Sequence, residues 1–174
     1  MQNEDFIDAS ISGKKFNLVL HPRSKGSARE WGLDNFAKLI ELLPEESYKI
    51  FITGTEEEGR SMHSFLKEQA GKITDLTGKL SLPQFISLLS KTDGIVAAST
   101  GPLHIAAALG KVAVGLYAPM HPIHPGRWAP IGEKAGYLVL NKMCNDCRKS
   151  MDCKCIRDIQ PLQVIEKIKT LDLK

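Results

Sequence analysis

Side chains and backbone groups suited to holding an anion lie close together in "STGPLHIAAALG", residues 99–110. The composition predicts a helix that opens on two hydroxyl residues, a glycine and a proline and ends at a glycine. Pro102 is expected at the first helical position, where its missing N–H costs nothing, and Ser99 or Thr100 is expected to cap the helix. The amides around Gly101 then point out of the helix start. Together with the helix dipole they favour an anion such as phosphate.

His104 lies one turn into this helix, on the face next to its start. It can donate a hydrogen bond, or a positive charge when protonated, to the same anion. The alternative is that Ser99 and Thr100 only cap the helix and that His104 is a partly buried histidine with its own partners.

A second candidate for anion binding is the loop "HPRSKGSAREW", residues 21–31. It follows an apolar run, at the position where doubly wound folds often contact phosphates. It has neither the G-x-G-x-x-G pattern nor the G-x-x-x-x-G-K-[ST] pattern. The alternative is a solvated basic loop. The polar residues and the glycine of this loop are Arg23, Ser24, Lys25, Gly26, Ser27 and Arg29.

Short apolar runs alternate along the chain with segments of helical periodicity. Continuously apolar strands that alternate with helices predict an α/β fold with a doubly wound, mainly parallel, Rossmann-like sheet and helices on both faces. Ligands of such sheets bind beyond the carboxyl ends of the strands, where both candidate loops are expected. The predicted strands span 16–21, 48–53, 73–76, 94–99, 112–117 and 135–140, and the predicted helices span 33–43, 56–70, 81–91, 99–110 and 161–173.

Length and composition favour one globular domain. The chain has 174 residues, of which 43% are hydrophobic, and a net charge of +3. No run reaches the length of a membrane span, and the charge lacks the clustered basic stripe of a nucleic-acid-binding protein. We expect a polar leader at residues 1–15 and a single domain at residues 16–174.

Four cysteines lie within "CNDCRKSMDCKC". The spacing C-x₂-C-x₅-C-x-C is compatible with a structural metal site, with disulfides or with free thiols, and the spacing alone does not decide among them. The nearby segment "APMHPIHPGRWAP", which contains His121 and His124, is expected to be an extended loop because it has four prolines. The four cysteines are Cys144, Cys147, Cys153 and Cys155.

Several motifs together resemble the carboxyl-terminal half of glycosyltransferase family 9, the heptosyltransferases of lipopolysaccharide core assembly. They are "LHPRSKGSAREW", "FITGTEEEG", "DLTGKLSLPQFISLLSKTDGIVAASTGPLHIAAALGK" and "VGLYAP". The most specific part is the T-G-x-x-H-x-A-A-A helix after an apolar strand, preceded by D-L-T-G-K-x-S-L. The resemblance implies one half of a two-domain GT-B enzyme, whose carboxyl-terminal half holds a nucleotide-sugar donor.

The resemblance also implies roles for individual residues. Thr100, Gly101 and His104 are expected to contact the donor diphosphate, and Arg29 falls where the family often has a phosphate-neutralising lysine. Ser24 or Ser27 can add hydrogen bonds, and Glu56 lies in a segment that often meets the nucleoside. Ser99 stands where many members have aspartate.

The chemistry of sugar transfer fits this placement. Negative charge develops on the departing diphosphate, and amides, Arg29 and His104 can stabilise it without a metal or other cofactor. In the family, the base of this inverting transfer comes from the amino-terminal half, which also holds the glycolipid acceptor. We therefore expect the chain to bind ADP-heptose, ADP or another nucleoside diphosphate sugar, and to be inactive without that half.

The resemblance places the protein in the bacterial cytoplasm and allows peripheral association with the inner face of the inner membrane. Two other functions fit the residues. One is a non-catalytic nucleotide-binding module, for which Ser99 is the sequence indication. The other is a metal- or redox-responsive module centred on Cys144–Cys155.

Overall fold

The core of the protein is a parallel β-sheet with the strand order β3-β2-β1-β4-β5-β6. The computed structural model describes residues 2–121, 124–141, 144 and 152–174, and within them every pair of neighbouring strands is parallel. This confirms the predicted doubly wound, Rossmann-like fold. The strands are β1 (Phe16–His21), β2 (Tyr48–Ile52), β3 (Ile73–Asp75), β4 (Gly94–Ala98), β5 (Val112–Tyr117) and β6 (Ala135–Val139).

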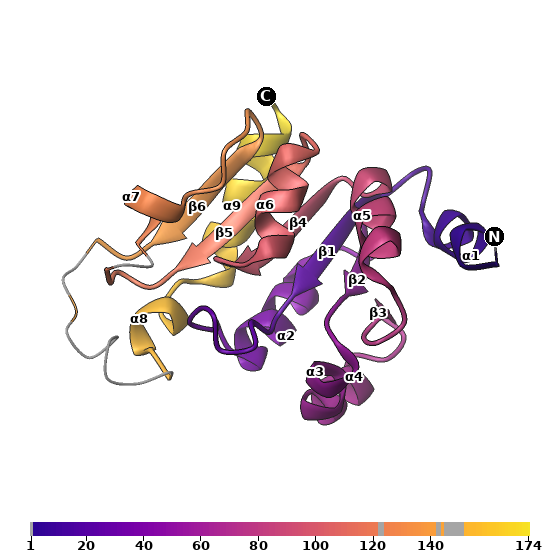
Figure 1. Cartoon of the computed structure of the whole chain (residues 1–174), viewed down its shortest axis with the longest axis horizontal. Helices are drawn as coiled ribbons and strands as arrows, with labels where there is room; N and C mark the ends of the chain where they lie inside the picture. The colour runs from indigo at the N-terminus through magenta and orange to yellow at the C-terminus, as the bar shows by residue number, and fades with distance from the viewer. Residues whose placement is uncertain (1, 122–123, 142–143, 145–151) are drawn as a thin grey trace.

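Helices cover both faces of the sheet (Figure 1). Helices α2 and α9 pack against each other on one face, and α5 and α6 lie on the other, with α1 against α5. The helices are α1 (Gln2–Ser10), α2 (Leu33–Leu42), α3 (Glu56–Ser61), α4 (His63–Glu68), α5 (Leu82–Lys91), α6 (Gly101–Ala108), α7 (Pro125–Trp128), α8 (Lys154–Arg157) and α9 (Pro161–Asp172).

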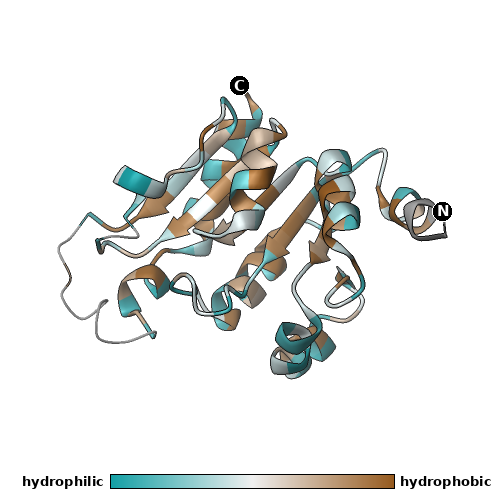
Figure 2. Ribbon diagram, in the orientation of Figure 1, coloured by the Kyte–Doolittle hydropathy of each residue, from teal (hydrophilic) through white to brown (hydrophobic). Residues whose placement is uncertain are grey.

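The apolar strands divide their side chains between the two faces. Leu18 and Leu20 of β1 belong to a buried cluster with residues of α2 and α9, whereas Val19 belongs to a second cluster with residues of α5 and α6. This division follows from the period of two along a strand. Figure 2 shows the result as hydrophobic central strands between helices of mixed polarity.

The predicted polar leader contains a helix, α1. Its Ile7 is buried against the α5 and α6 face, and Asp8 forms an ion pair with Lys91 of α5. A single buried isoleucine in a polar stretch is too weak a pattern to predict such a helix. The boundary at residue 16 stays a prediction, but residues on both sides of it share one hydrophobic cluster.

The predicted helix over 56–70 is divided into α3 and α4 at Met62. The Met62 N–H donates to both the Glu58 carbonyl at 3.0 Å and the Gly59 carbonyl at 3.2 Å, which tightens the turn there. The side chain of Met62 is buried. The apolar periodicity predicts the helical segment but not this local change of hydrogen bonding.

Two short helices lie where the sequence predicted none. Helix α7 replaces part of the predicted extended loop, because the His124 ring accepts a hydrogen bond from the Gly126 N–H at 3.1 Å and Pro125 starts the turn. Helix α8 carries Ile156, which is buried in the α2 and α9 cluster.

Trp31 connects the first loop to the carboxyl-terminal segment. Its ring packs at a right angle to Phe36, its side chain is buried, and its indole N–H donates to the Ile159 carbonyl at 2.8 Å. None of the helices in the described ranges is long and apolar enough to cross a membrane.

Replacing Trp31 with phenylalanine removes this hydrogen bond and leaves the Ile159 carbonyl unpaired in the interior. We expect Trp31→Phe to lower the free energy of unfolding by about 1–3 kcal/mol. Urea denaturation followed by circular dichroism measures the change. Trp128, the other tryptophan, is 45% exposed, and Trp128→Phe should cost less than about 1 kcal/mol. Equal losses in the two variants would contradict the anchoring role of Trp31.

Candidate functional site

A cavity of about 520 Å³ lies at the carboxyl ends of the strands, on the α5 and α6 face. It adjoins the point where the strand order reverses, because β1 pairs with both β2 and β4. The chain leaves β1 toward α2 on one face and leaves β4 toward α6 on the other. Open α/β sheets bind ligands beside such a reversal.

The cavity has an apolar wall and a polar wall. The polar groups come from three loops that follow β1, β2 and β4, so that residues far apart in the sequence meet there. The apolar residues are Leu76, Leu80, Leu82, Phe85, Pro102 and Ile105. The polar residues are His21, Ser24, Lys25, Ser27, Thr53, Thr55, Glu58 and Thr100, with Gly54 and Gly101 between them.

Thr100 and Gly101 line the cavity at the start of α6, in agreement with their predicted place. The helix begins at Gly101, so Pro102 is its second residue and not its first as expected. The Thr100 side chain makes no capping hydrogen bond; its hydroxyl donates instead to the Ala98 carbonyl at 3.3 Å. Of the two predicted capping residues, Thr100 occupies the N-cap position but makes no capping bond with its side chain. The Leu103 N–H donates to the Thr100 backbone carbonyl at 3.1 Å.

Ser99 is turned toward a different part of the fold. Its side chain lies near Tyr117 of β5, whose hydroxyl donates to the Trp128 carbonyl in α7. Burial raises the pKa of Tyr117, and the nearby Ser99 side chain opposes that shift by lowering it. Ser99 does not line the cavity, so the two hydroxyls of the motif are directed to separate surroundings.

The serines of the first loop line the cavity and also shape the loop. The Ser24 hydroxyl donates to the Ala28 carbonyl at 2.9 Å, and the Ser27 hydroxyl donates to the Ser24 carbonyl at 2.6 Å. The loop turns through Lys25 and Gly26, both with positive φ. Arg29 follows in the same loop, half-buried, and is not among the residues that line the cavity.

Glu30 holds the first loop from within. Its carboxylate accepts hydrogen bonds from the Ser24 backbone at 2.9 Å and from the Arg23 guanidinium at 2.8 Å. The sequence analysis did not single out Glu30, because an acidic residue in a basic loop shows no spacing that marks it as a support.

Glu56, which the resemblance places near the nucleoside, lies outside the cavity lining, and its contact with a donor stays a prediction. Glu56 is exposed, forms an ion pair with Arg60 and does not line the cavity. Glu58, two residues later, is 8% exposed and lines it. The Glu58 carboxylate accepts from the Thr55 N–H at 2.7 Å in a capping box at the start of α3. A T-x-x-E pattern is visible in the sequence and was the available signal.

His104 lies one turn into α6 and is half-buried, outside the set that lines the cavity. Its predicted contact with a bound anion stays a prediction.

His21 is a cavity residue that the sequence analysis missed. It ends β1, its ring nitrogen Nδ1 is 2.9 Å from the Thr53 hydroxyl, and its ring centroid is 6.1 Å from that of Phe85. Burial lowers the pKa of His21, and the charges of Glu58 and Glu30 oppose this shift. The alternation of side chains along a strand could have indicated this position, because it puts His21 on the same face of the sheet as Val19.

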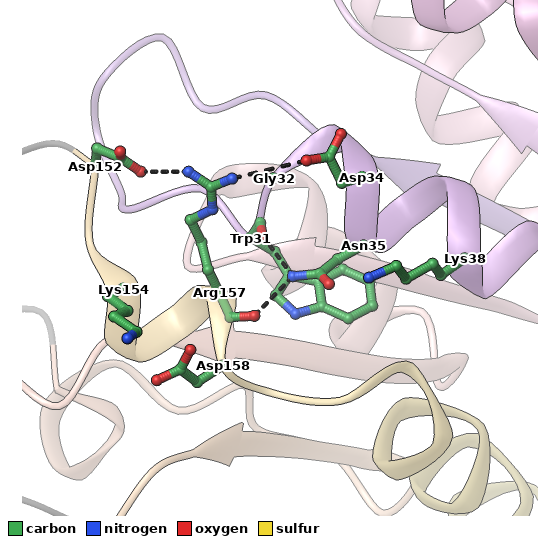
Figure 3. Close-up of a pocket in the computed structure, with 9 residues that line it drawn as sticks. All are labelled: Trp31, Gly32, Asp34, Asn35, Lys38, Asp152, Lys154, Arg157 and Asp158. Atoms are coloured by element: carbon green, nitrogen blue, oxygen red, sulfur yellow. Dashed lines mark hydrogen bonds and ion pairs between the residues drawn. The ribbon is translucent and has the colours of Figure 1, made fainter.

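A second cavity, of about 450 Å³, lies between α2 and α8 (Figure 3). Its charged groups are largely paired across it: Arg157 contacts Asp152 at 2.8 Å and Asp34 at 3.8 Å. The Asn35 amide bridges the Trp31 and Arg157 carbonyls at 2.9 and 2.8 Å. These contacts connect α8 to the start of α2 on the face opposite α5 and α6.

A family model shows where the chain belongs. Residues 2–155 match the model described as glycosyltransferase family 9 (heptosyltransferase). The chain belongs to glycosyltransferase family 9. Among curated family 9 relatives it is 29% identical over 170 residues to lipooligosaccharide heptosyltransferase 2 of Campylobacter jejuni, with 92% of this chain and 52% of that protein covered. It is 27% identical over 174 residues to lipopolysaccharide heptosyltransferase 2 of Escherichia coli, with 95% and 49% covered. The chain spans about half the length of these relatives.

Solved structures show the same fold. The E. coli ADP-heptose heptosyltransferase II superposes with a TM-score of 0.78 at 24% identity, over 99% of this chain and 51% of that one. The E. coli heptosyltransferase WaaC with ADP superposes with a TM-score of 0.72 at 17% identity, over 97% and 48%. The predicted resemblance to this family is confirmed.

The cysteine segment of this family 9 chain is described in part. Cys153 and Cys155 are buried and Cys144 is half-buried against the same cluster, while Cys147 lies outside the described residues. In the ranges that are described, no three His, Cys, Asp or Glu residues group closely enough to hold a metal ion. The metal or redox alternative centred on Cys144–Cys155 stays a prediction, because Cys147 lies outside the described residues.

The lowered pKa of His21 predicts a pH dependence of stability. The unfolded chain binds a proton near pH 6.5 and the folded chain only at lower pH. Stability from this residue is therefore complete above pH 6.5 and falls as the pH drops through the folded-state pKa. His21→Asn keeps a polar partner for Thr53 and removes the titration.

We expect the loss of stability between pH 7 and pH 5 to be smaller in His21→Asn than in the wild type, measured by urea denaturation at each pH. His63→Asn is the matched control, because His63 is exposed on α4. An identical pH profile for the wild type and His21→Asn would contradict the burial effect.

Proposed function

We propose that this chain is the donor-binding half of an inverting family 9 glycosyltransferase and that its ligand is a nucleoside diphosphate sugar, namely ADP-heptose. The observation that carries the proposal is the cavity beside the strand reversal, where an apolar wall meets the start of α6. A nucleoside diphosphate has a flat, weakly polar base at one end and a charged diphosphate at the other, so it matches both walls.

The walls suggest where each part of the donor binds. The base fits against Leu80, Leu82 and Phe85, which can exclude water from its faces. The Glu58 carboxylate at the rim of the same cavity is an acceptor for the ribose hydroxyls. The diphosphate then reaches Thr100 and Gly101, where amides and the helix dipole favour negative charge.

The sugar would continue past the start of α6. Ser99 precedes this helix and lies near Tyr117, whose hydroxyl donates to the Trp128 carbonyl of α7. Because Ser99 is neutral where many family members have a carboxylate, it changes the hydrogen-bonding capacity of this end of the site. We therefore propose that residue 99 influences sugar choice.

The donor-binding half would contribute to catalysis by stabilising the nucleoside diphosphate leaving group. As the sugar departs, negative charge grows on the diphosphate, and the start of α6 would offset it. Arg29 and His104, which do not line the cavity, would add to this if they contact the bound donor. The base that accepts the proton of the attacking hydroxyl would come from an acceptor-binding half. That half would also bind a glycolipid acceptor, on the cytoplasmic side of the membrane where nucleotide sugars are supplied.

Calorimetric titration with ADP, UDP and GDP tests the donor site. We expect ADP to bind best and Glu58→Gln to weaken ADP binding by roughly tenfold to hundredfold, because a hydrogen bond to a charged group contributes about 1.5–3 kcal/mol. Glutamine still completes the capping box, so the start of α3 is preserved.

Glu56→Gln is the matched control on the same helix and should change the affinity less than about twofold, since Glu56 is exposed and off the cavity. A loss in Glu56→Gln but not in Glu58→Gln would contradict the placement of the ribose. Absence of binding to all three nucleotides would overturn the donor site.

The proposal also predicts that this chain transfers no sugar by itself. Incubation with ADP-heptose and a lipopolysaccharide core acceptor should release no ADP above the rate of spontaneous hydrolysis, because the chain supplies no acceptor-side base. A chain joined to the acceptor-binding half of a relative should be active if the site is catalytic. Transfer by the isolated chain would contradict the proposal that the base and the acceptor site come from another half. A joined chain that is inactive but becomes active with Ser99→Asp would favour the non-catalytic module.

A further inference from the structure

His21 occupies a central position in the cavity for reasons of strand geometry. It ends β1 in register with Ala97 of β4, three residues before Thr100. On the other side of His21 lies Thr53, which follows β2. The Thr53 N–H donates to the Leu20 carbonyl at 3.1 Å. The ring therefore lies between the loop that starts α6 and the loop that starts α3, which are the two ends of the proposed donor site.

The Thr53 contact orients the ring. With Nδ1 2.9 Å from the Thr53 hydroxyl, that nitrogen has a partner that can either donate or accept. The contact therefore survives a change in the protonation of the ring. Among the described residues Nε2 has no hydrogen-bond partner, and we expect it to be the nitrogen that meets a ligand in the cavity that His21 lines.

The charged groups near His21 come from the first two loops. Glu58 on α3 and Glu30 in the first loop favour the protonated ring, whereas burial favours the neutral ring and has the larger effect. Lys25 is the cation among the lining residues, and α5 and α6 contribute uncharged residues to the lining. In the ligand-free protein the ring is thus mainly neutral near pH 7.

A bound diphosphate would reverse this balance. It carries at least two negative charges and would lie at the start of α6, next to the strand end that His21 occupies. Opposite charge within about 4–6 Å favours the charged form of a titrating group. The proton would come from solvent and go to the ring of His21, whose Nε2–H then donates to a phosphate oxygen.

We propose that His21 is a donor-binding residue of this site and that it takes up a proton from solvent when the anionic diphosphate binds. The inference rests on the proposed function, and it adds a residue to which the family resemblance assigns no role. It also makes the affinity for donor depend on pH, with tighter binding below neutrality.

Calorimetry in buffers of different ionisation enthalpy tests this, because the dependence of the observed heat on the buffer counts the protons taken up. ADP is titrated into the wild type at pH 6.5. We expect roughly 0.5 proton or more per ADP beyond the uptake in His21→Asn. The terminal phosphate of ADP also titrates in this range, but its contribution is common to all variants and cancels in the difference.

Two controls identify the histidine. His63→Asn, on an exposed part of α4, should match the wild type. His104→Asn tests the other histidine near the start of α6, and the excess proton uptake should persist in it. Because His21→Asn could disturb the fold, His21→Gln and the histidine ring proton signals of the wild type, recorded with and without ADP, provide independent measurements.

The outcomes separate this inference from the proposed function. ADP affinity that falls about tenfold from pH 6 to pH 8 in the wild type, but less in both His21 variants, supports it. Equal proton uptake in the wild type and His21 variants, or loss of the excess in His104→Asn alone, overturns the role of His21 while leaving the donor site intact. Failure of ADP to bind at both pH 6 and pH 8 overturns the donor site itself and the inference with it.

Discussion

The pairing of β1 with β4 is the constraint on which the site depends. Because the strand order reverses there, the chain must leave β1 toward one face and β4 toward the other, which opens a space beyond their carboxyl ends. The register that sets His21 opposite Ala97 also sets how far the first loop lies from the start of α6. A shift of one residue would move every β1 side chain to the opposite face and remove His21 from the cavity.

The loops around this space are held by contacts that are independent of any ligand. Glu30 binds the Ser24 backbone and Arg23, and Glu58 binds Thr55, so both loops have internal carboxylate acceptors. Trp31 then anchors the end of the first loop to the Ile159 carbonyl. A site whose walls are already ordered loses less conformational entropy when a ligand binds.

The cavity beside α6 and the cavity between α2 and α8 differ in how their charged groups are used. Between α2 and α8, Arg157 is paired with Asp34 and Asp152, so its charge serves to join two parts of the chain (Figure 3). Beside α6, the Thr100 side chain makes no capping bond. The facing wall of this cavity consists of apolar side chains. The second arrangement is the one that suits a ligand with an apolar and an anionic end.

The sequence by itself determined the alternation of strands and helices, the parallel sheet and the family, because continuous apolar runs and the T-G-x-x-H helix are local patterns. Ser24, Ser27, Thr100 and Gly101, predicted as donor contacts, line the cavity because loops after parallel strands gather at one edge, and their contact with a donor stays a prediction. Only the tertiary structure decided that Glu58 and not Glu56 lines the cavity, that Ser99 turns to Tyr117, and that His21 faces Thr53. For Ser99 and His21 the physical reason is that the side chain is directed by a neighbour more than ten residues away, which no local period specifies. For Glu58 the T-x-x-E pattern marks the local capping bond, but only the fold shows that this carboxylate lines the cavity.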